Sequence, residues 1–192
     1  MRKAQIERNT KETQIKIDLC LDGGDVEVST GIGFFDHMLV AFGVHGGFGL
    51  KINASGDLQV DTHHTVEDTG IALGRAFKEA LGDMSGIERY GSFSITMDEA
   101  LANCVLDISN RPFLVFNANF EQEKCGDYEN CMTEEFFRAF AMNAGITIHI
   151  DVPYGTNSHH KIEAIFKAVA HALKVAVKQN ENGAVLSTKG VL

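Results

Sequence analysis

Hydrophobic and polar positions along the chain follow two distinct periods. Residues 13–20 alternate apolar and polar side chains, which is typical of a strand with one buried face. From Ile162 to Val177, apolar side chains recur at spacings of three and four, which predicts a helix with one buried stripe. A similar pattern follows Gly31 and predicts a helix that buries the side chains of Phe34, Met38, Ala41 and Phe42.

The first half of the chain combines these elements in a short series. The charged segment 7–13 predicts a solvated edge, and a turn at 21–24 joins strand 13–20 to a strand around Val26 and Val28 as a hairpin. A strand at 48–54 and a helix ending near Leu81 complete this half.

The second half repeats the order of strands and helices. Its predicted elements are strands at 92–97, 101–108 and 113–119, a helix near 130–143, a strand at 146–152 and a final helix. Gly82 and Gly86 interrupt the pattern between the halves, so we predict units 1–85 and 86–192 packed as one compact body. The fold class is α+β with internal duplication, each half an antiparallel sheet with two helices on one face. Composition alone suggests a disordered tail at 183–192.

The same histidine-rich motif occurs once in each half. Residues 61–67 read DTHHTVE and residues 157–163 read NSHHKIE. Thr62 and Ser158 stand at the expected N-caps, which places each histidine pair on the first turn of a helix. An isolated motif would equally suit solvent-facing histidines beside a cap, but two copies at matching places favour a metal site.

Helix geometry divides the ligands of these motifs into two sets, one for each of two ions. Side chains four residues apart share a face, so His63 belongs with Glu67 and His159 with Glu163. The second histidine of each pair points about 100° away. His64 and His160 therefore complete the opposite sites, which mixes the two halves.

The helix that precedes each motif along the chain offers a further ligand. His37 lies in the first half, and Glu135 lies at the corresponding place in the second. The full set of candidate metal ligands is His37, His63, His64, Glu67, Glu135, His159, His160 and Glu163. Imidazoles with one or two carboxylates suit Mn, Fe, Zn, Co or Ni, and ligand type does not choose among them.

Composition and charge exclude several classes of partner. The 192 residues are 44% hydrophobic and 22% charged, as in an ordinary globular protein. A net charge of −9 argues against nucleic acid or an anionic membrane, although a local cluster of Arg and Lys could still hold a small anion. No apolar run approaches the roughly 18 residues of a membrane span. We expect a cytoplasmic protein whose four cysteines are reduced and mostly structural.

Several long motifs in order resemble the imidazoleglycerol-phosphate dehydratase family, a lyase family of histidine biosynthesis. The resemblance covers nearly the whole chain and is carried by residues 11–13, 31–39, 61–70, 109–112, 157–166 and 187–190. It implies a fold of the ribosomal protein S5 domain 2 type, and assembly of 24 subunits with active sites between neighbours. It also implies two Mn²⁺ per site, one held by His37, His64, His159 and Glu163, the other by His63, Glu67 and His160.

Two segments depart from the family pattern. Many members carry histidine where this chain has Glu135, so the fourth ligand of the second ion is a carboxylate or is absent. Val40 and Ala41 replace a frequent Asp-Gln pair, which removes one polar group near the expected phosphate.

The resemblance also implies how this chain would treat a phosphorylated imidazole substrate. The expected reaction removes water from imidazole glycerol phosphate and gives imidazole acetol phosphate. The positions that match substrate contacts of the family are His45, Arg89, Arg111, Lys167, Ser187 and Lys189. Lys167 could instead be a helix ion pair with Glu163, and Arg89 a surface charge.

The proton transfers of this reaction need a carboxylate or a metal-bound water. Glu12 matches the family's acid/base position, and Glu67 and Glu163 are the other carboxylates expected in the catalytic centre, as ligands.

Two other functions fit parts of the pattern. A di-metal hydrolase would use a similar histidine motif but would leave a glutamate free as base. A non-enzymatic metal-binding shell would need the histidines but would have no use for Arg89, Arg111, Lys167 and Lys189 at one place.

Overall fold

The computed structural model describes residues 1–180 and 183–190, and it contains two halves whose elements follow the same order, except that the second half has an additional two-stranded sheet. The last two residues of the expected tail, Val191 and Leu192, lie outside the described residues. The first half consists of β1 (Lys3–Asn9), β2 (Thr13–Cys20), β3 (Val26–Ser29), α1 (Gly33–Gly46), β4 (Gly49–Gly56) and α2 (His63–Leu81). The second half consists of β5 (Tyr90–Met97), β6 (Ala100–Ile108), β7 (Phe113–Asn117), β8 (Lys124–Cys125), β9 (Tyr128–Glu129), α3 (Met132–Ala144), β10 (Ile146–Tyr154) and α4 (Ser158–Ala176).

Each half builds one four-stranded sheet, with strand orders β1-β2-β4-β3 and β5-β6-β10-β7. The α+β class and the duplication are confirmed, but the sheets are not wholly antiparallel. β3 pairs with β4 in parallel, and β7 pairs with β10 in parallel. A helix connects the two strands of each parallel pair, and such a crossover brings the chain back in the same direction.

The predicted hairpin between β2 and β3 is wrong. β2 is flanked by β1 and β4 on its two edges, so no edge remains for β3. The charged entry segment lies at the edge of the sheet, as expected: residues 7–9 end the edge strand β1, and residues 10–12 form the turn into β2.

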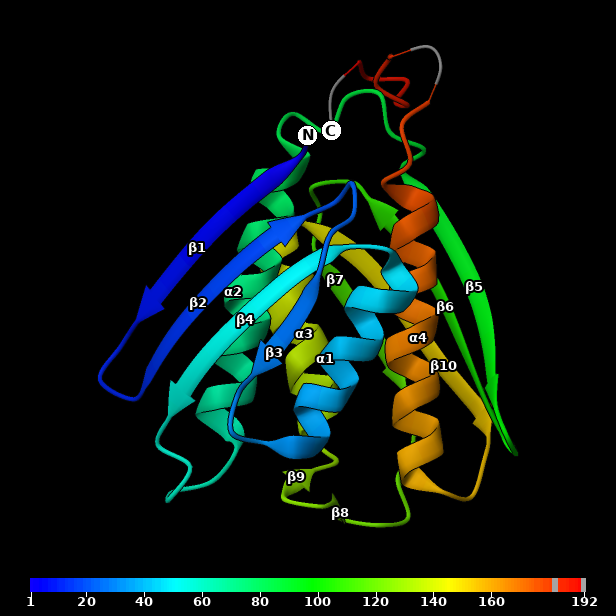
Figure 1. The fold of residues 1–192 in the computed structure, drawn as a ribbon. Coiled ribbons are helices and arrows are strands. Elements are labelled where there is room, and N and C mark those ends of the chain that lie inside the picture. The colour runs from blue at the N-terminus through cyan, green and yellow to red at the C-terminus, as the bar shows by residue number, and fades with distance from the viewer. Residues whose placement is uncertain (181–182, 191–192) are drawn as a thin grey trace.

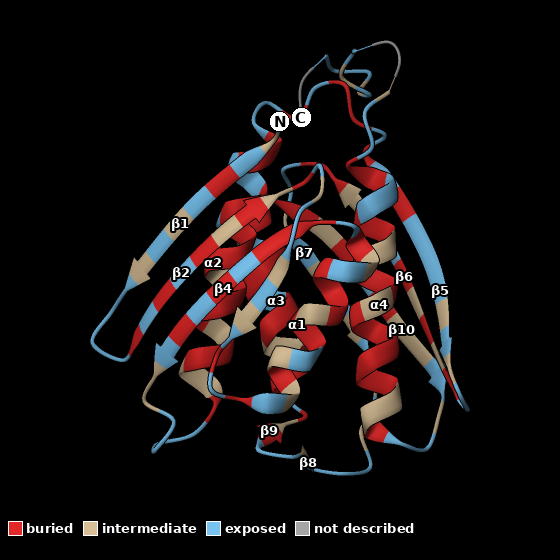
Figure 2. Cartoon of the chain, in the orientation of Figure 1, coloured by how far each residue is buried: buried red, intermediate tan, exposed pale blue. Residues whose placement is uncertain are grey.

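The four helices lie between the two sheets, as Figure 1 shows. α2 packs on α3 and α1 packs on α4, so each helix contacts the other half. Buried residues colour the inner faces of both sheets and the facing sides of the helices (Figure 2). Phe77 joins the halves, with its ring centroid 6.0 Å from that of Phe42 and 5.2 Å from that of Phe140. The apolar core is therefore continuous across both halves.

Two glycines let α2 approach α3 closely. A Cβ atom at Gly70 would lie 2.7 Å from the carbonyl oxygen of Phe136, and one at Gly74 would lie 2.6 Å from that of Phe140. Both distances are below van der Waals contact, so a larger residue would push the helices apart.

The buried face of α1 is close to the predicted one. Met38, Ala41 and Phe42 are buried, but Phe35 is fully buried while Phe34 is half-buried. Phe34 contacts the rings of Tyr128 and His159, at centroid distances of 5.5 and 4.9 Å. α1 is thus covered by β3 on one side and α4 on the other, which widens its apolar stripe.

Among the described helices, none is both long enough and apolar enough to cross a membrane.

Candidate active site

Both histidine motifs lie on the first turn of a helix, as predicted. Thr62 stands at the N-cap of α2, also as predicted, but the N-cap of α4 is Asn157 and not Ser158. Asn157 caps α4, because its side chain accepts a hydrogen bond from the backbone N–H of His159 at 2.9 Å. Asp61 accepts from the N–H of His63 at 2.8 Å, whereas Thr62 makes no capping bond. Ser158 is the first residue of α4 and bonds to Gln122 instead. Each motif is therefore fixed by the Asx side chain at its start.

Three of the predicted metal ligands converge within one chain. The Nε2 atoms of His37 and His159 lie 3.6 and 3.2 Å from Oε2 of Glu163. One ligand atom from each of these residues lies within 4.8 Å of the other two. Two ligands about 2.1–2.2 Å from an ion can be about 4.4 Å apart at most, so these three residues fit a shared divalent ion with little movement.

Lys167 holds the carboxylate of this trio from its other side. Its Nζ lies 2.6 Å from Oε1 of Glu163, so the predicted alternative of a helix ion pair is what the structure shows. Burial alone would raise the pKa of Glu163, but the hydrogen bond and charge of Lys167, with His37, lower it below its usual value. Glu163 is therefore ionised and ready to bind a cation.

The motif of the first half is less complete. His63 Nε2 lies 3.4 Å from Oε2 of Glu67, and both side chains are nearly half exposed. Glu135 lies on the first turn of α3, where its carboxylate contacts Nε of Arg138 at 3.4 Å. Over the described parts of the chain, the only group of three or more such ligands close enough for one ion is the trio on α1 and α4.

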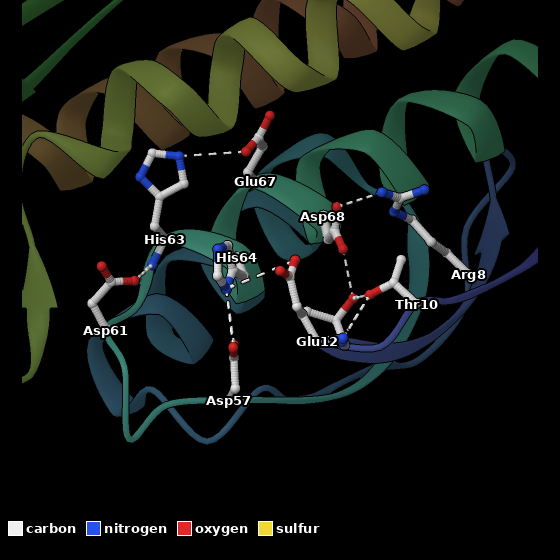
Figure 3. A network of polar contacts seen from close by, with 10 residues as sticks. Arg8, Thr10, Glu12, Asp57, Asp61, His63, His64, Glu67 and Asp68 are labelled. Atoms are coloured by element: carbon white, nitrogen blue, oxygen red, sulfur yellow. Dashed lines mark hydrogen bonds and ion pairs between the residues drawn. The ribbon is translucent and has the colours of Figure 1, made fainter.

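His64 faces two carboxylates at the end of the first sheet (Figure 3). Its Nδ1 lies 3.1 Å from both oxygens of Asp57 and 3.9 Å from Oε2 of Glu12. The hydrogen bond with Asp57 raises the pKa of His64 above its usual value. The structure thus brings the predicted acid/base Glu12 beside a predicted metal ligand.

A partly buried network of hydrogen bonds fixes the turn that carries Glu12 (Figure 3). Thr10 Oγ1 accepts hydrogen bonds from the backbone N–H groups of Glu12 and Thr13. Thr13 Oγ1 donates to Asp68 at 2.5 Å, and Arg8 Nη2 pairs with the other oxygen of Asp68 at 2.7 Å. Because Asp68 lies on α2, the network joins the Glu12 turn to the helix of the first histidine pair.

His160 also has a carboxylate partner, which the sequence did not reveal. Nδ1 of His160 lies 2.7 Å from Oε2 of Glu99, and Nε2 lies 3.7 Å from Asp98. The hydrogen bond with Glu99 raises the pKa of His160, and the same bond lowers the pKa of Glu99 far below its usual value. No local pattern relates Glu99 to His160, because the turn between β5 and β6 is distant from α4 in sequence.

The predicted phosphate contacts fall into two groups. Arg89 is buried and binds Asp107 with two bonds, Nε to Oδ1 at 2.7 Å and Nη2 to Oδ2 at 3.0 Å. Arg89 also donates from Nη1 to the carbonyl oxygen of Leu186, which ties the tail segment before Ser187 and Lys189 to this place. The alternative that Arg89 is a surface charge is wrong, whereas the side chain of Arg111 is 67% exposed, with Nη2 3.8 Å from Asp107.

Lys167 and His45 lie elsewhere. Lys167 contacts the trio rather than the arginines. His45, near the C-terminal end of α1, has Nδ1 3.3 Å from Nε2 of His171, whose ring stacks on Phe93 at 4.4 Å. Burial lowers the pKa of both histidines, so this pair is neutral near pH 7.

Comparison with known proteins gives a consistent result. The family model described as imidazoleglycerol-phosphate dehydratase matches residues 30–173. A curated protein of that name from Phenylobacterium zucineum is 54% identical over 194 residues, covering 100% of this chain and 99% of the relative. One from Lactococcus lactis subsp. cremoris is 56% identical over 199 residues, covering 100% of this chain and 98% of the relative.

Solved structures of similar proteins have the same fold. The imidazoleglycerol-phosphate dehydratase of Staphylococcus aureus superposes with a TM-score of 0.84 at 44% identity, over 92% of this chain and 98% of that one. A Pyrococcus furiosus structure, described as IGPD in complex with (S)-C348, superposes with a TM-score of 0.86 at 38% identity, over 97% and 100% of the two chains.

Proposed function

The chain belongs to the imidazoleglycerol-phosphate dehydratase family, and from this premise we propose that its active sites hold two Mn²⁺ ions and are shared between copies of the chain. The enzyme is a hydro-lyase that removes water from imidazole glycerol phosphate and gives imidazole acetol phosphate in histidine biosynthesis. The observation that carries the metal proposal is the convergence of His37, His159 and Glu163.

We assign the ligands to the two ions as helix geometry and the family resemblance suggest. The first ion takes the trio of His37, His159 and Glu163 together with His64. The second takes His63, Glu67 and His160, with Glu135 as the fourth ligand. The packing of α3 on α2 supports Glu135 in this role, because both first turns lie at the same end of the helical layer.

The length of α4 supports sites built from more than one copy. Arg89 donates its backbone N–H to the carbonyl of Ala176 at the C-terminal end of α4, whereas Glu163 lies near the N-terminal end. At about 1.5 Å per residue, these positions are roughly 20 Å apart along the helix. A substrate with a three-carbon chain spans less than about 10 Å, so Arg89 and Arg111 cannot hold the phosphate of a substrate bound at their own trio.

Exposed apolar residues also support self-association. The outer face of the second sheet carries Val105, Phe113 and Val115, all exposed. Val105 and Val115 lie on either side of His149 in the strand register, and Phe113 is paired with Thr147 beside them. The matching face of the first sheet instead carries charged residues such as Lys16, Asp18 and Lys51. We propose that the apolar face is buried between copies in the 24-subunit assembly.

The residues of the chain divide the chemistry between them. The bound ions would supply Lewis acidity, which lets the imidazole ring of the substrate release electrons toward the departing hydroxyl. Arg111, with Ser187 and Lys189 of the nearby tail, would hold the phosphate and so fix the reacting carbons. Glu12, beside His64, would take the proton from the carbon chain and return it to the product carbon.

The two alternative functions fit the site less well. A hydrolase would need a glutamate free to act as base, but Glu163 contacts two histidines and Lys167. A metal-binding shell without enzymatic activity gives no role to Arg111, which lies beside a buried Arg89–Asp107 pair.

The four thiols support the expected cytoplasmic location. Cys20, Cys104, Cys125 and Cys131 are all unpaired, as in proteins of a reducing compartment.

Turnover with defined metal tests the proposal. The purified protein should lose dehydratase activity after chelation and recover it on addition of Mn²⁺. Activity that persists in protein verified to contain no divalent metal would overturn the two-ion site.

Substitution of Arg111 by alanine tests the phosphate contact. R111A should raise KM by about 10-fold or more, since it removes a charged hydrogen-bond donor to a dianion. R75A, which removes an exposed arginine from α2, is the matched control and should leave KM unchanged. An unchanged KM in R111A would contradict the assignment of Arg111 to the phosphate.

A further inference from the structure

The second histidine of each motif is held in the same way in both halves. Nδ1 of His64 faces the carboxylate of Asp57, and Nδ1 of His160 faces that of Glu99. The first histidines differ, because His63 and His159 present Nε2 to the glutamate four residues later. An ionised carboxylate can only accept, so the Nδ1 atoms of His64 and His160 must carry the hydrogen.

The two carboxylates reach their histidines from different places in the fold. Asp57 directly follows β4, in the connection to α2 that Figure 3 shows beneath His64. Glu99 lies in the turn between β5 and β6 and crosses to the start of α4. The internal duplication therefore does not explain the shared arrangement, because corresponding positions do not supply the two acids.

Glu99 is itself rigidly held. Its Oε1 accepts from the backbone N–H groups of Thr156 and Asn157 at 3.0 and 2.8 Å, which leaves Oε2 for His160. Asp57 has its own constraint, because its backbone carbonyl accepts from the N–H of Val60 at 2.8 Å. Backbone hydrogen bonds thus fix the position of both acids, and each acid in turn holds its imidazole ring.

We propose that Asp57 and Glu99 are positioning residues that fix His64 and His160 as the Nδ1–H tautomer and aim each Nε2 lone pair at a metal ion. The inference rests on the proposed two-ion site. A carboxylate behind a metal-bound imidazole orients the ring and makes it a stronger donor, and losing such a partner lowers metal affinity by about 10- to 100-fold. Because His64 and His160 serve different ions, the two acids act on different ions as well.

Titration of Mn²⁺ into metal-stripped protein measures the effect on each ion. D57A should weaken the ion bound by the His37–His159–Glu163 trio, and E99A should weaken the other ion, each by about 10- to 100-fold. E99Q keeps an acceptor oxygen, so its Mn²⁺ affinity should lie between that of E99A and that of wild type. An affinity in both alanine variants equal to that of wild type would overturn the proposal.

Two matched controls separate positioning from general effects. D18N removes a carboxylate from the exposed face of β2, away from every histidine of the motifs, and should leave both affinities unchanged. T156A removes one contact of the loop with Glu99 but leaves the Glu99–His160 bond, so it should also bind both ions normally. If T156A lost as much Mn²⁺ affinity as E99A, the role of Glu99 would be to hold the loop at Thr156, and its proposed role in positioning His160 would be overturned.

The tautomer of each ring is a readout that does not depend on metal. Nitrogen-15 NMR of metal-stripped protein, at a pH where the rings are neutral, should find the Nδ1–H tautomer for His64 and His160. D57A and E99A should shift the corresponding ring toward the Nε2–H form, while wild-type rings found as Nε2–H would overturn the proposal. Wild-type protein that binds no Mn²⁺ yet shows the expected tautomers would instead refute the two-ion site alone.

Discussion

The two copies of the histidine motif differ in how far a single chain completes them. On α4, the side chain of Glu163 is only 9% exposed and contacts His37, His159 and Lys167. On α2, the side chain of Glu67 is 44% exposed and contacts His63. The duplication thus preserved the motif while its surroundings diverged.

Single positions account for this divergence. Lys167 follows Glu163 by one helical turn, and Ile71 stands at the matching place after Glu67. His37 of α1 reaches the trio, whereas Glu135 of α3 contacts Arg138. The difference teaches that one half-site is preorganised within the chain, while the other depends more on its neighbours. We therefore expect added Mn²⁺ to fill the site at the trio before it fills the other site.

The largest expected effect on metal binding comes from removing His37 of α1, and we compare it with removal of Glu135 at the corresponding place on α3. H37A should weaken Mn²⁺ binding at the trio by at least about 100-fold. Losing a residue that only supports a ligand already costs up to about 100-fold in metal affinity, and His37 is itself a ligand. E135A should weaken the other ion by only about 10-fold, since Arg138 already competes for this carboxylate. Calorimetric titration of metal-stripped variants measures both. Equal losses would show that the halves are equally preorganised.

The next effect concerns the stability of the metal-free protein. E163Q removes the charged partner of a partly buried Lys167 and should lower the free energy of unfolding by about 1–3 kcal/mol. E67Q alters a solvent-screened contact and should cost less than about 0.5 kcal/mol. Denaturant unfolding in the presence of chelator gives the two values. A larger loss in E67Q than in E163Q would reverse the comparison.

A smaller effect is expected in the ionisation of the histidines. The hydrogen bond to Asp57 raises the pKa of His64, and that to Glu99 raises the pKa of His160. Burial lowers the pKa of His45 and of His171, which lie away from the motifs. NMR titration of metal-free protein should therefore find two histidines above the usual value near 6.5 and two below it. All four at the same value would contradict the assigned contacts.

The sign of the stability change follows from these directions. A raised pKa stabilises the folded state fully below the unfolded pKa, and this contribution is lost as pH rises through the folded pKa of His64 and His160. Mn²⁺ affinity should rise across the same pH window, because only the neutral rings bind metal. The lowered pair, His45 and His171, acts oppositely and loses its contribution as the pH falls.

Local sequence patterns predicted the features that depend on local spacing. The periods of apolar residues gave both histidine helices, and spacings of four gave the His63–Glu67 and Glu163–Lys167 contacts. The family resemblance added Glu12, which the structure brings near His64.

Features that depend on contacts between distant segments were missed. The parallel pairing of β3 with β4 requires knowing how α1 crosses the sheet, which alternation within a strand does not encode. Glu99 and Asp107 are ordinary charged residues in sequence, and only folding brings them to His160 and Arg89. The capping roles of Asp61 and Asn157 had a visible signal, because Asx residues two positions before a helical N–H commonly accept from it.

Complementation between inactive variants tests the shared site most directly. H63A and H159A each remove one motif histidine from every copy, so each variant alone should be inactive. Co-expressed with different tags and purified as mixed oligomers, they should recover about a quarter of wild-type activity, because that share of sites combines an intact α2 from one copy with an intact α4 from another. Mixed oligomers that stay as inactive as either variant would contradict an active site built between copies.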